Sequence, residues 1–140
     1  MTKQVIEGIN KGEATLINNL TQKRGDLTPE IIYKAALKGD KFAIQIIQKT
    51  GYYLGLGLVN LVNLLNPEVI VIGGDISQVA DVLLKPVKEV VSSRALSAPA
   101  QRVKILASHF GKDAGILGAA TLFLESVFQI PEVRLNPVSK

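Results

Sequence analysis

The stretch NPEVIVIGGDIS, residues 66–77, decides how the rest of the chain is interpreted. Its apolar run from Val69 to Ile72 is β-branched throughout, without polar alternation, which is typical of a parallel-sheet strand covered on both faces. Asn66 precedes a proline and is therefore biased away from helical angles, so a preceding helix ends here. The strand leads directly into Gly73 and Gly74, and this exit is the first candidate for a ligand-binding loop.

A long helix is expected before this strand, because apolar residues recur at helical spacing from Lys41 to Leu65. Asp40 is placed to cap its first turn. Gly51 and Gly55 lie four residues apart and share a face, so we expect another backbone to approach closely there. The second half of the helix carries few polar residues, which predicts burial nearly all round.

Further elements complete an α/β order. Helical character resumes from Val79 to Val91, with Pro86 expected to open a second helical stretch. The segment RVKILAS, residues 102–108, predicts a second strand, and the residues after Gly111 predict another helix. We therefore expect parallel strands joined by a right-handed crossover.

The two ends of the chain give weaker patterns. A helix through Leu20 is suggested by apolar spacing, and Thr28, which stands before a proline, predicts the start of the next helix. Residues 129–140 contain two prolines and are expected to be irregular. We expect one domain over residues 1–140, with residues 1–27 poorly assigned.

Composition narrows the classes of function. Without cysteine, disulfides and thiolate metal sites are excluded, and the single histidine, His109, cannot build a zinc site, so we expect no metal. The net charge is +4, but basic and acidic residues are interleaved, which favours a solvated surface over a nucleic-acid stripe. No apolar stretch is long enough to cross a bilayer, and the N-terminus lacks a signal-peptide core. We expect a cytoplasmic protein without a membrane partner.

Gly73, Gly74 and Asp75 follow the first strand at its carboxyl end, where open α/β sheets bind their ligands. Glycine lets a base or a sugar approach the backbone, and Asp75 either accepts hydrogen bonds from a ribose or caps the next turn. Local features alone favour a plain strand-to-helix turn, because a lone Gly-Gly pair is a weak signal. Gly111 and Gly115 follow the second strand at the same edge, and two glycine-lined loops together favour a ligand cleft.

Two segments resemble the C-terminal part of the ROK family, which contains bacterial sugar kinases and sugar-responsive transcriptional repressors. They are GDKFAIQIIQKTGYYLGLGLVNLVNLLNPEVIVIGGDIS, residues 39–77, and GKDAGILGAATLFLE, residues 111–125. The resemblance runs from about Leu27 to Glu125 and implies an actin-like, RNase H-like ATPase fold, here helix-rich with a short parallel sheet. It also implies that the loop at Gly73 and Gly74 faces the adenosine of ATP in the kinases.

Several motifs of the family are absent from this sequence. Family kinases carry a phosphate-binding loop, a catalytic aspartate, a histidine-containing sugar motif and a cysteine-rich zinc motif, and family repressors carry a winged-helix DNA reader. Half a cleft cannot transfer a phosphoryl group, so we expect a C-terminal fragment without catalytic residues, and we reject His109 as a catalyst. No cofactor is expected here, whereas ATP and magnesium would serve a full-length kinase parent.

Two hypotheses for the parent protein remain. The favoured one is the effector-binding and oligomerisation part of a ROK-type transcriptional regulator, because Asp75 stands where kinases more often have a third glycine. The continuation into VFQIPEVRLNPVSK, residues 127–140, is also more usual in the repressors. The alternative is the ATP-side lobe of a glucokinase-like or fructokinase-like sugar kinase. We expect a homo-oligomer, with the sugar and any DNA contacted through sequence missing here.

Overall fold

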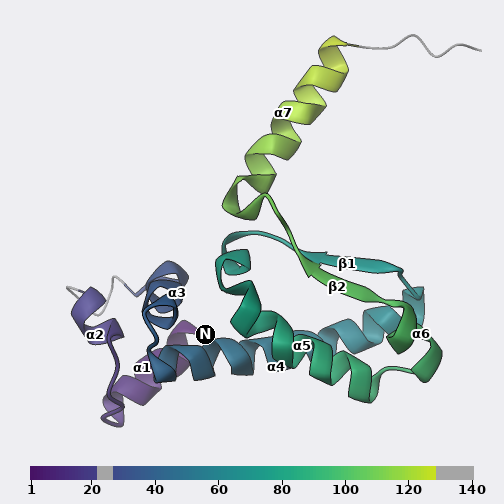
Figure 1. Ribbon diagram of the computed structural model, residues 1–140. Coiled ribbons are helices and arrows are strands. Elements are labelled where there is room, and N and C mark those ends of the chain that lie inside the picture. The colour runs from purple at the N-terminus through teal and green to yellow at the C-terminus, as the bar shows by residue number, and fades with distance from the viewer. Residues whose placement is uncertain (22–26, 129–140) are drawn as a thin grey trace, which may run out of the picture.

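Two parallel strands, β1 (Val69–Ile72) and β2 (Lys104–Ala107), form the sheet of the computed structural model, which describes residues 1–21 and 27–128 (Figure 1). Residue Val69 pairs with Lys104, and Ile72 pairs with Ala107. Both predicted strands and their parallel pairing are confirmed. Within the predicted segment 102–108, however, Arg102 ends a short helix, α6 (Ser97–Arg102), which the sequence analysis did not anticipate.

The helices α4 (Lys41–Leu65) and α5 (Ala80–Arg94) lie beneath the sheet in Figure 1 and pack on each other. The two predicted packing glycines lie at this contact. A Cβ atom on Gly51 would stand 2.6 Å from the carbonyl oxygen of Leu83, and one on Gly55 would stand 2.8 Å from Cβ of Val90. The expected close approach of a second backbone is therefore confirmed.

Three shorter helices surround the start of α4: α1 (Thr2–Asn10), α2 (Ile17–Leu20) and α3 (Pro29–Leu37) (Figure 1). The helix expected to run through Leu20 is thus interrupted, because Gly12 adopts a φ of 86° in a turn after α1. The predicted start at Thr28 is confirmed, with the following proline in the first turn of α3. The predicted irregular tail, residues 129–140, lies outside the described residues.

The buried core joins all of these helices to the sheet. It is made mostly of aliphatic side chains. The largest fully buried side chains are Val5, Ile17, Ile32, Ile47, Val62, Leu83, Val87 and Val91. On the strands, Ile105 is buried and Ile70 is half-buried, so this face of the sheet packs towards the helices.

The expectation that the strands are covered on both faces is wrong for the described residues. Val69 and Val71 are 47% and 60% exposed, because the last helix, α7 (Ala114–Val127), extends away from the sheet in Figure 1. The second half of α4 is likewise not buried all round, and Leu64 is 80% exposed. The helices α1 and α3 lie at the beginning of α4, and among the described residues they do not reach its later turns, where Leu64 lies.

The expected helix start at Pro86 is also wrong, since this proline lies inside α5. A proline within a helix removes one hydrogen bond and normally clashes with the preceding turn. Here the ring stands against α4 at Gly51, where a Cβ atom would come within 2.7 Å of Cγ of Pro86. Gly51 therefore leaves room for the ring against α4, although α5 still lacks the hydrogen bond that the missing N–H would donate.

Candidate functional site

The loop after β1 turns sharply at its two glycines. Gly74 has φ 86° and ψ −169°, a conformation that side-chain-bearing residues rarely adopt. It leads into a short 3-10 helix, η2 (Asp75–Val79). The hydroxyl of Ser77 donates a 2.7 Å hydrogen bond to the carbonyl oxygen of Gly74, which holds the turn closed. The sequence thus needs glycine at this exit for a conformational reason.

The loop after β2 lies against the first loop. The amide of Ser108 donates to the carbonyl oxygen of Ile72 at 2.8 Å, which continues the sheet by one bond. A Cβ atom on Gly73 would stand 3.5 Å from Cβ of Ser108, and one on Gly111 would stand 3.7 Å from the hydroxyl oxygen of Ser77. The predicted neighbourhood of the two glycine-lined loops is therefore present in the structure.

The five predicted site residues lie in different elements at the carboxyl end of the sheet. Asp75 begins η2 with its side chain exposed, and Gly111 begins the short 3-10 helix η3 (Gly111–Asp113), which contacts η2. Gly115 lies in the first turn of α7, and a Cβ atom there would meet nothing within 4 Å. The structure thus brings Gly73, Gly74 and Gly111 to one edge, and Gly115 lies one element further on, in the helix that follows η3.

Tyr33 is a site neighbour that the sequence analysis missed. It lies on α3, which contacts η2, and its side chain is buried. Burial raises the pKa of the Tyr33 hydroxyl, and the negative charges of Glu30 and Asp75 raise it further. The hydroxyl therefore stays protonated at neutral pH. Nothing in the local sequence signals this role, because Tyr33 and η2 meet only through the tertiary fold.

The serines Ser77 and Ser108 are two further residues that the sequence analysis did not select. Ser108 directly follows β2, Ser77 lies five residues after β1, and each side chain stands beside a glycine of the opposite loop. A partial signal was available, because hydroxyls in the loops after two parallel strands are expected to lie at one edge of the sheet.

This edge of the sheet presents groups that can hydrogen-bond a ligand. It offers glycine backbone, serine hydroxyls and the carboxylate of Asp75. The rejected catalyst, His109, is exposed, with its ring centroid 6.1 Å from that of Phe110 in an edge-to-face arrangement. In residues 1–21 and 27–128, no three side chains of the metal-binding types come together as a metal site. Across the same residues, none of the helices has the length and apolarity needed to span a membrane.

Comparisons with known proteins give one consistent family. The model of the ROK family matches residues 4–126. A glucokinase from Halalkalibacterium halodurans is 37% identical over 116 residues, which cover 83% of this chain and 35% of the relative. The DNA-binding transcriptional repressor Mlc of Escherichia coli is 35% identical over 94 residues, which cover 67% of this chain and 23% of the relative. The chain thus spans about a third or less of the length of these relatives.

Solved structures give the same picture. The structure of a ROK family transcriptional regulator, a homologue of the E. coli Mlc protein, superposes with a TM-score of 0.73 at 34% identity. The match covers 84% of this chain and 29% of that one. A Cytophaga hutchinsonii protein proposed to be a sugar kinase gives a TM-score of 0.69 at 26% identity, covering 89% of this chain and 40% of its own.

Proposed function

The chain belongs to the ROK family, whose fold is that of the actin-like ATPases, and from this premise we propose that it serves a sugar-responsive transcriptional regulator. In this proposal the chain is the C-terminal half of the regulator's effector-binding and oligomerisation region. The sugar and the operator DNA would be contacted by residues outside this sequence. No phosphoryl transfer is expected from it.

The observation that carries the proposal is the exposed carboxylate of Asp75 directly after Gly74. If this loop faces the adenosine of a nucleotide, as the family resemblance implies, the negative charge of Asp75 opposes the phosphates of ATP only from a distance. Two unit charges near a protein surface interact by a few kcal/mol at about 4 Å, and by roughly 1 kcal/mol or less at the longer separation between an adenosine-facing residue and the phosphates, where water and salt screen them. The loop therefore keeps its glycine geometry while its charge opposes a nucleoside triphosphate.

A sugar kinase is the second candidate, with this chain as its ATP-side lobe. Its support is the 37% identity to the Halalkalibacterium halodurans glucokinase, together with the two adjoining glycine-lined loops. The two proposals differ in whether the Asp75 loop binds ATP.

Calorimetry with ATP on the natural protein that carries this sequence separates the two candidates. For the regulator we expect no measurable heat of ATP binding, and no hexose phosphorylation with ATP and magnesium above a no-enzyme control. For the kinase we expect both signals, and Gly74→Val should abolish ATP binding, because a branched side chain is strained at this positive φ. Circular dichroism would verify that the variant still folds.

A charge-neutralising variant tests the role of Asp75 directly. Asp75→Asn keeps the shape of the side chain and removes its charge. Removing about 1 kcal/mol of repulsion lowers the Kd for ATP roughly fivefold, so we expect heat of binding at ATP concentrations where the wild type gives none. Asp81→Asn is the matched control, because Asp81 is an equally exposed aspartate in the first turn of α5. Unchanged ATP affinity in Asp75→Asn would remove the basis of the regulator proposal.

A further inference from the structure

Tyr33 brings a hydroxyl group to the glycine-lined edge, and the proposed function does not use it. Only 6% of this tyrosine is exposed, and it belongs to the same core cluster as Val79, the last residue of η2. In the described part of the chain, every fully buried polar side-chain atom has a hydrogen-bond partner. The Tyr33 hydroxyl makes no hydrogen bond to the described residues, so its oxygen reaches solvent although the ring is buried.

A free acceptor, the carboxylate of Asp75, lies on the neighbouring element. Asp75 begins η2, which contacts α3, and its side chain is exposed. Burial raises the pKa of the Tyr33 hydroxyl, and the negative charges of Glu30 and then Asp75 raise it further. The Asp75 carboxylate therefore acts on the hydroxyl through space, and no hydrogen bond joins the two groups. A donor and an acceptor thus stand at one edge without satisfying each other.

The two serine hydroxyls of this edge already have partners. The Ser77 hydroxyl donates to the carbonyl oxygen of Gly74 at 2.7 Å, and the Ser108 hydroxyl accepts from the Phe110 amide at 3.2 Å. The space beside Gly74 is open, because a Cβ atom there would meet nothing within 4 Å. A small ligand can therefore lie against the backbone of Gly74, with the free donor and the free acceptor as its polar contacts.

The donor and the acceptor together select the kind of group that can bind. A protonated tyrosine donates a hydrogen bond and an ionised carboxylate only accepts, so a ligand that joins them must accept and donate at once. Alcohol hydroxyls do both, and they reproduce the bonds of any water that they displace. A carbonyl cannot donate to the carboxylate, and an ammonium group cannot accept from the tyrosine. A phosphate would meet two negative charges, those of Glu30 and Asp75.

We propose that Tyr33 and Asp75 form a site beside Gly74 for an uncharged ligand with hydroxyls on adjacent carbons, as in a monosaccharide or a ribonucleoside. One ligand hydroxyl accepts a hydrogen bond from Tyr33, and its neighbour donates one to Asp75. The inference rests on the proposed function in one respect, namely that this loop keeps a binding role without ATP, and it names the class of ligand. It is a second site, because residues outside this sequence would contact the sugar effector of the regulator.

The test titrates the full 140-residue chain with two probes, D-xylose and uridine, and follows its amide NMR signals. We expect one of them to shift the amides of Gly74 and Asp75, and the probe that does so identifies the source of the hydroxyls. Each probe has a matched analogue without adjacent hydroxyls. These are a tetrahydropyran ring with a single hydroxyl for D-xylose, and deoxyuridine for uridine. The analogue should bind at least about fivefold more weakly, as expected for the loss of one hydrogen bond.

Tyr33→Phe is the decisive variant, because it removes the hydroxyl and keeps the buried ring. It should weaken the probe that binds at least about fivefold. Asp75→Ala, at an exposed position, should weaken it by a similar factor and does not depend on the packing of the core. Tyr53→Phe is the matched control and should bind as the wild type does, since Tyr53 is 57% exposed on α4, away from this edge. Urea unfolding would verify that each variant is folded.

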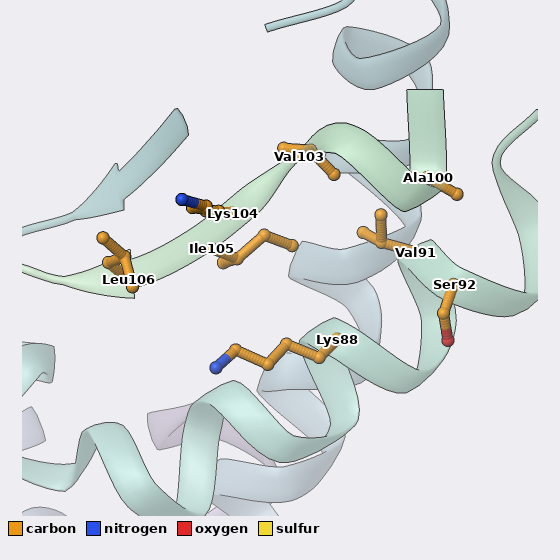
Figure 2. A pocket seen from close by; sticks show the side chains of 8 residues that line it. All are labelled: Lys88, Val91, Ser92, Ala100, Val103, Lys104, Ile105 and Leu106. Carbon is orange, nitrogen blue, oxygen red and sulfur yellow. The ribbon is translucent and has the colours of Figure 1, made fainter. Parts of the chain in front are cut away.

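The hollow between β2, α5 and α6, of about 310 Å³, is the internal control (Figure 2). Its polar side chains, Lys88, Ser92 and Lys104, are all exposed, so no buried tyrosine or carboxylate selects a hydroxyl group there. The probes should leave the amide signal of Ile105, which lines this hollow, unchanged.

The proposal is wrong if neither probe shifts the amides of Gly74 and Asp75, or if the Ile105 amide shifts as strongly as they do. It is also wrong if Tyr33→Phe binds the probe as tightly as the wild type, or if uridine monophosphate binds more tightly than uridine. ATP calorimetry is a separate measurement, so these outcomes leave the choice between regulator and kinase to that experiment.

Discussion

At the scale of single residues, Asp40 is a buried carboxylate that links the start of α4 to the segment before α2 by hydrogen bonds. It is 6% exposed and accepts hydrogen bonds from the Ala43 amide at 2.8 Å, from the Thr15 hydroxyl at 2.8 Å and from the Leu16 amide. One carboxylate thus caps α4 and fixes the segment before α2. Burial alone would raise the pKa of Asp40, but these hydrogen bonds to the charged form outweigh it, and the net pKa is lowered.

A lowered pKa gives a pH dependence of stability with a definite sign. The stabilisation is present above the unfolded-state pKa of about 3.9 and is lost as the pH falls through the lower, folded-state pKa. We expect Asp40→Ala to reduce the free energy of unfolding by about 1–2 kcal/mol at neutral pH, as for a lost helix cap. The variant should also lose less stability than wild type on acidification, which urea titrations at a series of pH values would measure.

The control for Asp40 is Glu13→Ala, because Glu13 is exposed in the turn after α1. This variant should follow the wild-type pH profile closely. If Asp40→Ala retained the wild-type stability or the wild-type response to acid, the carboxylate would not be the link described here.

Some features of the candidate site can be predicted from single residues of the sequence, and others cannot. The positive φ angles of Gly74 and Gly111 were predictable, because glycine after a strand signals an unusual backbone angle in the local sequence. Tyr33 was not predictable. It reaches η2 only because α3 packs there, and no local pattern encodes a contact between segments some 40 residues apart in sequence.

At the scale of elements, the contact between α4 and α5 depends on glycines whose roles can be separated. Gly51 has no room for a Cβ atom against the Leu83 carbonyl, whereas a Cβ atom on Gly57 of the same helix would meet nothing within 4 Å. We expect Gly51→Ala to lower the free energy of unfolding by about 1–3 kcal/mol through overpacking. Gly57→Ala should raise it by up to about 1 kcal/mol through helix propensity.

Thermal or urea unfolding followed by circular dichroism measures both glycine variants, and each serves as the control for the other. The same chemical change is made in one helix, so only the packing environment differs. Equal effects of the two substitutions would contradict the close approach of α5 at Gly51.

Most elements were predictable because periodicity and capping are local. The range Lys41–Leu65, its cap at Asp40 and the β-branched run of β1 all followed from neighbouring residues. The failures are tertiary. Pro86 lies inside α5 with its ring against Gly51 of another helix, a contact that the local sequence does not show. Burial was also overestimated. An apolar sequence indicates that a helix or strand face is suited to burial, but not whether another part of the described chain covers that face.

At the scale of the whole molecule, apolar surface is exposed in three places. It lies on the outer face of the sheet, on the later turns of α4 and along α7. The most exposed large side chains there are Val71, Leu64, Leu65, Ile116, Leu122, Phe123 and Phe128. Parallel sheets are almost always covered on both faces, and monomeric proteins rarely expose large contiguous apolar patches. This surface therefore favours association.

We expect the chain to form a homodimer or a larger assembly through these apolar faces, with two-fold symmetry as the simplest closed arrangement. A stable interface buries roughly 800 Å² on each partner, which one helix face or one sheet face can supply. We expect association to use the face that carries Val71 or the one that carries Leu64, and two variants distinguish these faces.

Light scattering over a wide dilution series is the direct measurement. Val71→Glu places a charge on the outer sheet face, and Leu64→Glu places one on the exposed side of α4. The variant that alters the true interface should shift the dissociation midpoint to higher concentration by at least about tenfold, because burying an unpaired carboxylate costs more than 1.4 kcal/mol. Gln45→Glu, at an exposed polar position of α4, should leave the midpoint unchanged. A wild-type chain that stays monomeric at the highest concentration would show that these apolar faces do not drive self-association.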